Sequence, residues 1–133
     1  MSKKFYPAVF QKEDVGYSVF FPDLEGCFTQ GDTLEEAYIM AVDAIGLYLE
    51  DSETGIFRFP ETSEITSIST DENQTIVLVE FDEIEYRKRH NNKSVKKTLS
   101  IPQWLNIMAE ENNINFSQVL QKALKAELHL TNA

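Results

Sequence analysis

Carboxylates are the residues of this sequence with the most obvious chemical potential, because several of them together could hold a divalent metal ion. The chain has 22 Asp and Glu against 12 Lys and Arg. Metal-dependent cleavage of nucleic acid needs several carboxylates that converge on Mg²⁺ from strands and helices facing one pocket. The candidate strands at residues 4–10 and 17–21 contain no acid, and Glu80 stands alone on the last candidate strand. The pattern therefore predicts no catalytic centre and no metal site.

Other catalytic chemistries have no better support. Cys27 has no obvious His partner, since His90 falls in a polar stretch and His129 lies near the end of the chain. No glycine-rich loop that could cradle a phosphate is present in the sequence. We expect a protein that is not an enzyme and that needs no cofactor. The remaining acids near the candidate strands lie in turns or at a helix start, where the helix dipole favours them: Asp14, Asp23, Asp32, Glu35 and Glu36.

Charge divides the chain into two parts of opposite sign. Residues 1–86 hold 4 Lys and Arg against 19 Asp and Glu, a net charge of −15. Residues 87–133 hold 8 Lys and Arg against 3 Asp and Glu, a net charge of +5. An acidic surface attracts basic proteins and repels nucleic acid, and a basic surface does the opposite. Acidic residues alone would also suit a merely soluble domain, but the reversal of sign favours two modules with two kinds of partner.

The elements of the acidic part predict an antiparallel sheet covered by one helix. Aromatic and β-branched residues favour strands at 3–11, 17–21, 27–31 and 76–81, with a turn at Gly16 and a polar loop over 60–74. The first strand is rich enough in apolar residues to be buried on both faces. A helix begins at Thr33, where the Thr33-x-x-Glu36 spacing is that of a capping box, and its apolar stripe ends near Glu50. The order is β-β-β-α-β.

The basic part predicts a small unit of one strand and two helices. Residues 87–94, RKRHNNKS, are almost free of apolar side chains and are assigned to a linker. Residues 95–101 favour a strand, Pro102 suits the first position of a helix that runs to about Asn113, and Asn115 is placed to cap a second helix. That second helix carries an apolar stripe made of Phe116, Val119, Leu120, Ala123, Leu124 and Leu128.

This basic unit is predicted to be complete only as a dimer. It is smaller than the ~40 residues at which domains usually fold without disulfides, metals or association. Its strand also has no partner within the unit, so its backbone groups would stay unpaired. Two copies that pair their strands would form a two-stranded ribbon with Lys96, Thr98 and Ser100 facing outward, and such a ribbon fits the DNA major groove.

Residues 95–128 resemble the ribbon-helix-helix DNA-binding modules of the Arc and MetJ kind. The resemblance implies that Lys96, Thr98 and Ser100 read bases, with Lys96 as the strongest reader. It also implies that the backbone N–H groups of Phe116 and Ser117, at a helix start, bind a phosphate. Further cations would add attraction independent of sequence, although the last three of them fit a solvated linker equally well: Lys93, Lys97, Arg87, Lys88 and Arg89.

Residues 22–37, PDLEGCFTQGDTLEEA, closely resemble the signature of the HicB antitoxins. The likeness extends in element order over residues 3–82. It implies a partial ribonuclease-H-like fold without nuclease activity, and a HicA-type toxin as partner, which is a small basic ribonuclease that cuts messenger RNA. Carboxylates on turns would then imitate RNA phosphates at the active site of the toxin. The residues expected on that surface are Asp14, Asp23, Glu25 and Asp32.

Together these features predict an α+β antitoxin that also represses its own operon by binding operator DNA. The expected domains are a toxin-neutralising domain at 1–86, the linker at 87–94, and a ribbon-helix-helix domain at 95–133 that forms a homodimer, with a dimer of dimers as a further option. With no signal peptide and no membrane span recognised in the sequence, we expect a cytoplasmic protein. The alternative is a stand-alone ribbon-helix-helix regulator whose N-terminal domain senses a ligand or another protein.

Overall fold

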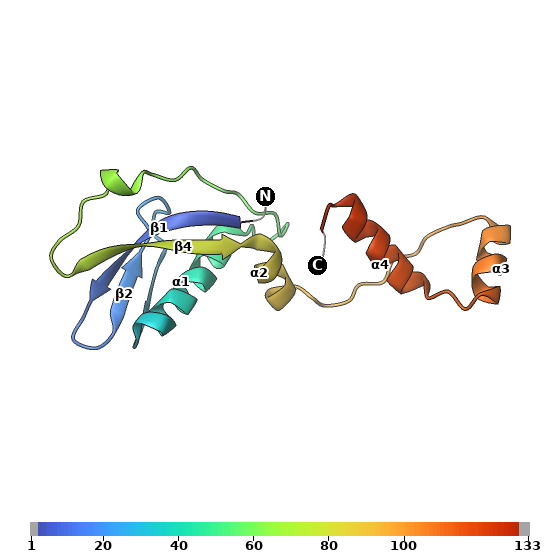
Figure 1. Ribbon diagram of the computed structural model, residues 1–133, viewed down its shortest axis with the longest axis horizontal. Helices are drawn as coiled ribbons and strands as arrows, with labels where there is room; N and C mark the ends of the chain where they lie inside the picture. Colours follow the sequence, from blue (N-terminus) through green and yellow to red (C-terminus); the bar gives the residue numbers. More distant parts are fainter. Residues whose placement is uncertain (1–2, 131–133) are drawn as a thin grey trace. The chain divides into compact units, whose positions relative to one another are not determined.

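A computed structural model describes residues 3–130 and divides the chain into two compact units, residues 1–93 and 94–133 (Figure 1). Over the described residues the fold is α+β, with one four-stranded antiparallel sheet and four α-helices. All of the sheet lies in the N-terminal unit, and two helices make up the regular structure of residues 94–130 in the C-terminal unit. The predicted fold class is thus confirmed at the level of α+β, and each unit is described separately below.

The N-terminal unit follows the predicted order β-β-β-α-β and adds one helix. The strands lie side by side in the order β3-β2-β1-β4, with every neighbouring pair antiparallel. The predicted boundaries agree with the observed ones to within two residues. The elements are β1 (Lys3–Lys12), β2 (Tyr17–Phe20), β3 (Phe28–Gly31), α1 (Leu34–Leu49), the short 3-10 helix η1 (Ile65–Ser67), β4 (Gln74–Asp82) and α2 (Glu83–His90).

The register between β1 and β4 explains how a proline can lie within a strand. The Lys12 N–H donates to the Asn73 carbonyl oxygen at 2.9 Å. In an antiparallel ladder, hydrogen-bonded and non-hydrogen-bonded pairs alternate, so every second residue pair of β1 and β4, counted from Lys12 and Asn73, is hydrogen-bonded. Pro7 lies opposite Leu78, in one of the alternate pairs, so its missing N–H costs no bond to β4. On the other side of β1, β2 pairs only with residues 9–12 and does not reach Pro7. The proline therefore interrupts neither ladder.

The core lies between one face of the sheet and α1. Alternate residues of β1 (Tyr6, Ala8 and Phe10) point to this face, and so do Val79 and Phe81 of β4. The middle of β1 is buried at every position from residue 6 to residue 10, as predicted for a strand buried on both faces. α1 begins as expected, because the Thr33 side chain accepts a hydrogen bond from the Glu36 N–H at 3.1 Å. The helix buries its small and branched residues on the sheet: Ala37, Ala41, Ile45 and Leu49.

The helix α2 was not predicted, and it occupies the first half of the stretch assigned to the linker. Residues 87–90 are its last turn, whereas residues 91–94 have no regular secondary structure. Asp82 caps the helix by accepting a hydrogen bond from the Glu85 N–H. Tyr86 anchors it to the core, with its ring 5.4 Å from the ring of Phe81 and edge-on to that of Phe57.

The C-terminal unit contains α3 (Gln103–Glu111) and α4 (Phe116–Glu127), close to the two predicted helices. Pro102 is the N-cap residue of α3, whereas the sequence predicted it as the first residue within the helix. The Asn115 side chain accepts a hydrogen bond from the Gln118 N–H at 3.0 Å, which confirms the predicted cap of α4. The predicted strand at 95–101 is not formed, because residues 91–102 have no regular secondary structure and the single chain offers them no strand to pair with.

Candidate functional site

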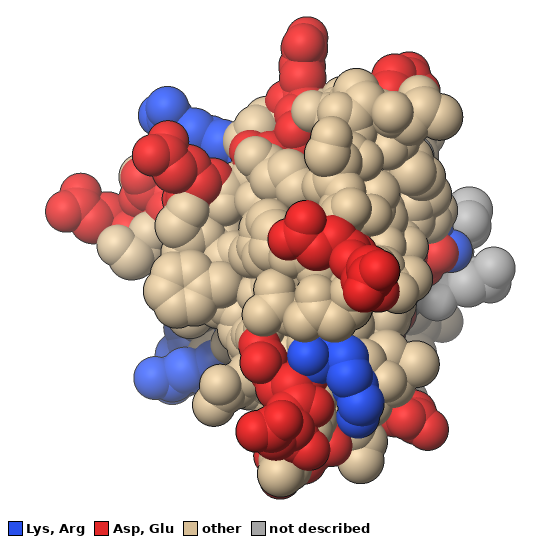
Figure 2. All heavy atoms as spheres, turned by 90° about the vertical axis from the view of Figure 1, so that its left-hand side faces the viewer, with Lys and Arg blue, Asp and Glu red and all other residues tan. Residues whose placement is uncertain are grey.

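The carboxylates predicted to face a protein partner lie on the surface of the N-terminal unit. Asp14 is exposed in the turn between β1 and β2, where the Glu13 N–H donates to the Gly16 carbonyl oxygen and Gly16 has a φ of 75°. Asp32 is exposed at the residue before the N-cap of α1. Acidic side chains outnumber basic ones on the face shown in Figure 2. This surface is suited to a basic partner and unsuited to nucleic acid.

Asp23 has a structural role that the sequence did not reveal. One oxygen of its carboxylate accepts a hydrogen bond from the Ser63 N–H at 2.9 Å, and the other accepts one from the Ser63 hydroxyl at 2.5 Å. These bonds join the turn after β2 to the long loop before β4, 40 residues later in the chain. Asp23 is half-buried, whereas Glu25 in the same turn is exposed. Of the four predicted carboxylates, Asp14, Glu25 and Asp32 are therefore the most accessible.

The motif at residues 22–37 is explained largely by packing. Leu24 is fully buried, and Gly31 lies so close to the first turn of α1 that a Cβ at this position would overlap the backbone of Ala37. Cys27 is buried, and burial raises the pKa of its thiol to about 11. Its Sγ donates to the Ala44 carbonyl oxygen at 3.6 Å. A thiol in this environment is almost wholly protonated at neutral pH, so it is not a nucleophile.

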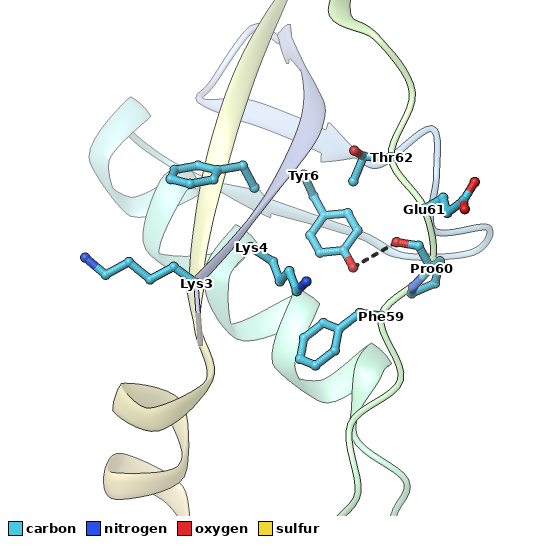
Figure 3. Close-up of a pocket in the computed structure, with 8 residues that line it drawn as sticks. Lys3, Lys4, Tyr6, Phe59, Pro60, Glu61 and Thr62 are labelled. Carbon is cyan, nitrogen blue, oxygen red and sulfur yellow. Dashed lines mark hydrogen bonds between the residues drawn. The ribbon is translucent and has the colours of Figure 1, made fainter. Parts of the chain in front are cut away.

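Two shallow hollows lie on the N-terminal unit. One, of about 580 Å³, runs between the start of β1 and residues 59–62 (Figure 3). There the Tyr6 hydroxyl donates to the Pro60 carbonyl oxygen at 3.2 Å, and the Lys4 Nζ lies 5.4 Å from the centre of the Phe59 ring. Burial, with the charge of Asp23, raises the pKa of Tyr6. The other hollow, of about 570 Å³, is lined by Phe20, Phe28 and Met40 among others.

The residues predicted to bind DNA through the strand and the start of α4 are all exposed, and all but Lys93, the last residue of the N-terminal unit, belong to the C-terminal unit. Lys96, Thr98 and Ser100 lie on the irregular segment 91–102, as do Lys93 and Lys97. Phe116 and Ser117 are the first two residues of α4, and within the described residues their backbone N–H groups donate to no acceptor. The start of α4 therefore keeps the donors that a phosphate would need.

The cations of α2 are engaged with the N-terminal unit. The Arg87 Nε donates to Glu83 at 2.8 Å, and the Arg87 guanidinium lies 4.5 Å from the centre of the Phe57 ring. Arg89 lies 3.7 Å from the carboxylate of Asp43 on α1. These residues are part of a packed helix rather than of a solvated linker, and the contacts of Arg87 and Arg89 leave less of their charge available to DNA.

The C-terminal unit leaves its apolar side chains uncovered. None of residues 94–130 is buried in the single chain. Trp104 of α3 is 63% exposed and Leu124 of α4 is 50% exposed. Large apolar side chains exposed together on one small unit mark a surface that associates with another.

The described residues contain no other recognisable chemical centre. Among residues 3–130, no three His, Cys, Asp or Glu side chains are grouped so that they could hold a metal ion. None of the helices in this range has the length and apolar character required to cross a membrane.

Comparison with known proteins gives a consistent result. The family model described as HicB_like antitoxin of bacterial toxin-antitoxin system matches residues 6–126. The Antitoxin HicB 2 of Photorhabdus laumondii is 39% identical over 71 residues, which are 53% of this chain and 47% of that protein. A 14.9 kDa protein from the rep-hol intergenic region of Haemophilus phage HP1 is 47% identical over 60 residues, 45% of each chain. The alignment thus spans about half the length of these two relatives.

A solved structure resembles nearly the whole chain. It is a chain of a toxin–antitoxin complex from Streptococcus pneumoniae, 30% identical in sequence, with a TM-score of 0.58. The alignment covers 94% of this chain and 99% of that one, so it includes both the sheet and the C-terminal helices.

Proposed function

This chain belongs to the HicB-like antitoxin family of bacterial toxin–antitoxin systems, and on that premise we propose that its N-terminal unit binds and inhibits a basic, HicA-type ribonuclease toxin. The observation that carries the proposal is the charge of residues 1–86, with 4 Lys and Arg against 19 Asp and Glu. Carboxylates on exposed turns imitate the phosphates of an RNA substrate and pair with Lys and Arg around the active site of the toxin. Substrate is then excluded from that site.

The accessible carboxylates of this unit are the ones to test. We expect the double variant Asp14→Asn, Asp32→Asn to bind a HicA-type toxin at least ~10-fold more weakly at low salt, because charges at the rim of an interface act mainly on the rate of association. The difference should shrink as salt is added. The measurement is a titration of toxin ribonuclease activity with the full-length antitoxin.

The matched control is Glu110→Gln, Glu111→Gln, which removes the same charge from the C-terminal unit. Thermal unfolding of each variant separates binding from stability, since Asp32 also lies near the start of α1. Equal inhibition by the wild type and by both double variants would contradict the assignment of these turns. If the wild-type antitoxin left the toxin fully active, the proposed function itself would be wrong.

We further propose that the C-terminal unit forms a ribbon-helix-helix dimer that binds operator DNA and represses its own operon. Two features support this proposal: the apolar side chains of α3 and α4 are uncovered, and the backbone of residues 95–101 is unpaired. A second copy of the C-terminal unit would cover these side chains and would pair with this backbone as a neighbouring strand. In this arrangement Lys96, Thr98 and Ser100 face the major groove, and the start of α4 binds phosphate. The DNA-binding domain is then residues 95–133, and the toxin-binding domain predicted at 1–86 extends to the end of α2 at residue 90.

Base reading by Lys96 has a measurable signature. We expect Lys96→Ala to weaken operator binding by about 1–3 kcal/mol while changing the affinity for random DNA much less. Lys93→Ala is the matched control. Loss of a phosphate contact should weaken binding to operator and to random DNA alike, and it should reduce the slope of log affinity against log salt concentration by about one. Fluorescence anisotropy with labelled operator and random duplexes gives both affinities. An equal loss on the two duplexes for Lys96→Ala would assign Lys96 to phosphate.

A further inference from the structure

Two basic side chains at the end of α2 face one oxygen of Asp43 on α1. The Arg89 guanidinium lies 3.7 Å from the Asp43 Oδ1, and the His90 Nε2 lies 3.8 Å from the same atom. This oxygen is shielded from solvent, yet it accepts no hydrogen bond from any residue in the range 3–130. Arg89 is therefore held by charge alone, without the directional hydrogen bond that makes an ion pair strong.

Arg87, in the same turn of α2, is held in a different way. Its Nε donates to Glu83 at 2.8 Å, and its guanidinium lies over the ring of Phe57. The Arg87 side chain is 36% exposed, whereas that of Arg89 is 51% exposed. Release of Arg87 would break a charged hydrogen bond and a ring contact, and release of Arg89 would break neither. Arg89 is thus the arginine that can exchange its partner more easily.

The acid that holds Arg89 belongs to the N-terminal unit and not to α2 itself. Among residues 3–130, Asp43 is the only acid outside α2 that pairs with a basic side chain of this helix. The other two pairs, Arg87 with Glu83 and Lys88 with Glu85, lie within the helix and travel with it. The contact of Arg89 can therefore be removed by changing one residue of α1.

The end of α2 is joined by a short stretch of chain to the segment proposed to read bases. Lys96 follows His90 by six residues, and six residues of fully extended chain span at most ~22 Å. One turn of B-DNA is about 34 Å long and carries one phosphate charge per ~1.7 Å of its axis. If Lys96 lies in the major groove, the last turn of α2 therefore stays within one helical turn of it.

We propose that Arg89 is a latent contact for a DNA phosphate, and that Asp43 withholds it from DNA. This inference rests on the proposed binding of operator DNA by residues 95–133. While Arg89 faces Asp43, its charge is balanced and adds little to the affinity for DNA. Once Asp43 is neutral, the guanidinium turns to a phosphate, which its planar set of donors fits.

The consequence concerns affinity and not sequence recognition. A phosphate contact carries no direct sequence information, so it strengthens binding to operator and to random DNA alike. Asp43 therefore lowers the affinity of the chain for all DNA and leaves the choice of site to the residues that face the groove. The acidic turns that carry Asp14 and Asp32 take no part in this contact.

Neutralising Asp43 in the full-length chain tests the proposal. We expect Asp43→Asn to bind a random duplex about 3- to 10-fold more tightly at low salt, and to steepen the slope of log affinity against log salt concentration by about one. Operator affinity should rise by the same factor. The matched control is Glu72→Gln, which removes the same charge from an exposed turn before β4, at the other end of this strand from α2. It should raise affinity less than about twofold, because distant charges are screened.

A double-mutant cycle assigns the gain to Arg89. Arg89→Gln alone should change DNA affinity by no more than about twofold, whereas added to Asp43→Asn it should remove most of the gain. Fluorescence anisotropy gives the affinities, and thermal unfolding shows whether α2 stays packed in each variant.

Three results would overturn the inference while leaving operator binding by the wild type in place. They are an Asp43→Asn variant that behaves like Glu72→Gln, a gain that persists without Arg89, and a loss of tenfold or more from Arg89→Gln alone. The last would mean that Arg89 already contacts DNA in the wild type. A wild-type chain that binds neither duplex would overturn both this inference and the proposed repression.

Discussion

Replacing Leu124 with Asp is expected to abolish operator binding while leaving the N-terminal unit folded. Leu124 lies in the apolar stripe of α4 with Phe116, Val119, Leu120 and Leu128 and is 50% exposed in the single chain. In the proposed dimer this stripe forms the shared core. A carboxylate there would be buried without a partner, which costs several kcal/mol at least. Since none of residues 94–130 of the C-terminal unit is buried in the single chain, this part of the chain has no core of its own that could compensate for the loss.

The expected result is a monomeric C-terminal unit and a loss of at least ~100-fold in operator affinity, equivalent to about 3 kcal/mol. Sedimentation of the full-length chain measures association, and near-ultraviolet circular dichroism reports on the aromatic core of the N-terminal unit. Gln118→Asp adds the same charge on the opposite side of α4 and should leave association unchanged. If Leu124→Asp bound operator like the wild type, the ribbon-helix-helix dimer would be excluded.

Replacing Gly46 with Ala is expected to destabilise the N-terminal unit, although the same change usually stabilises a helix by up to ~1 kcal/mol. A Cβ at Gly46 would overlap the ring of Tyr86. That ring cannot move aside easily, because Phe57 and Phe81 pack against it and the His90 ring stacks on it at 4.2 Å. Overpacking of this kind costs typically 1–3 kcal/mol.

We therefore expect Gly46→Ala to lower the Tm of this unit by several degrees, since ~1 kcal/mol corresponds to roughly 4–8 °C in a domain of this size. The control is the same substitution combined with Tyr86→Ala. With the ring removed, alanine at position 46 should be neutral or stabilising relative to Tyr86→Ala alone. A higher Tm for the single variant Gly46→Ala would show that α2 does not pack against α1 as described.

Periodic patterns in the sequence predicted most of the N-terminal unit, and the helix they missed has no such pattern. β1 to β4 and α1 bury one or both faces, so their apolar residues recur at regular intervals. α2 has six charged or imidazole side chains among its eight residues, EIEYRKRH. Tyr86 is its one buried residue, and the Tyr86 ring lies in the space left by Gly46. Nothing within 87–90 itself distinguishes this last turn from a linker.

The sequence predicted which residues lie on the candidate surfaces, but it did not predict the hydrogen bonds that these residues make within the protein. The motif at 22–37 indicated Asp23 as a partner contact, and its bonds to Ser63 depend on a loop 40 residues away. At residues 95–101 the sequence predicts an element that the single chain does not form. Its alternation predicts a strand whose formation depends on a second chain.

The absence of buried side chains from residues 94–130 bears on how long a chain survives in the cell. Proteases cleave backbone that is not held in a folded core, and cleavage follows the population of open forms. Two copies are proposed to build the C-terminal core together, so a dilute chain offers its tail for degradation and a concentrated one protects it. Turnover would then fall as expression rises, and the amount of intact protein would increase more steeply than its rate of synthesis.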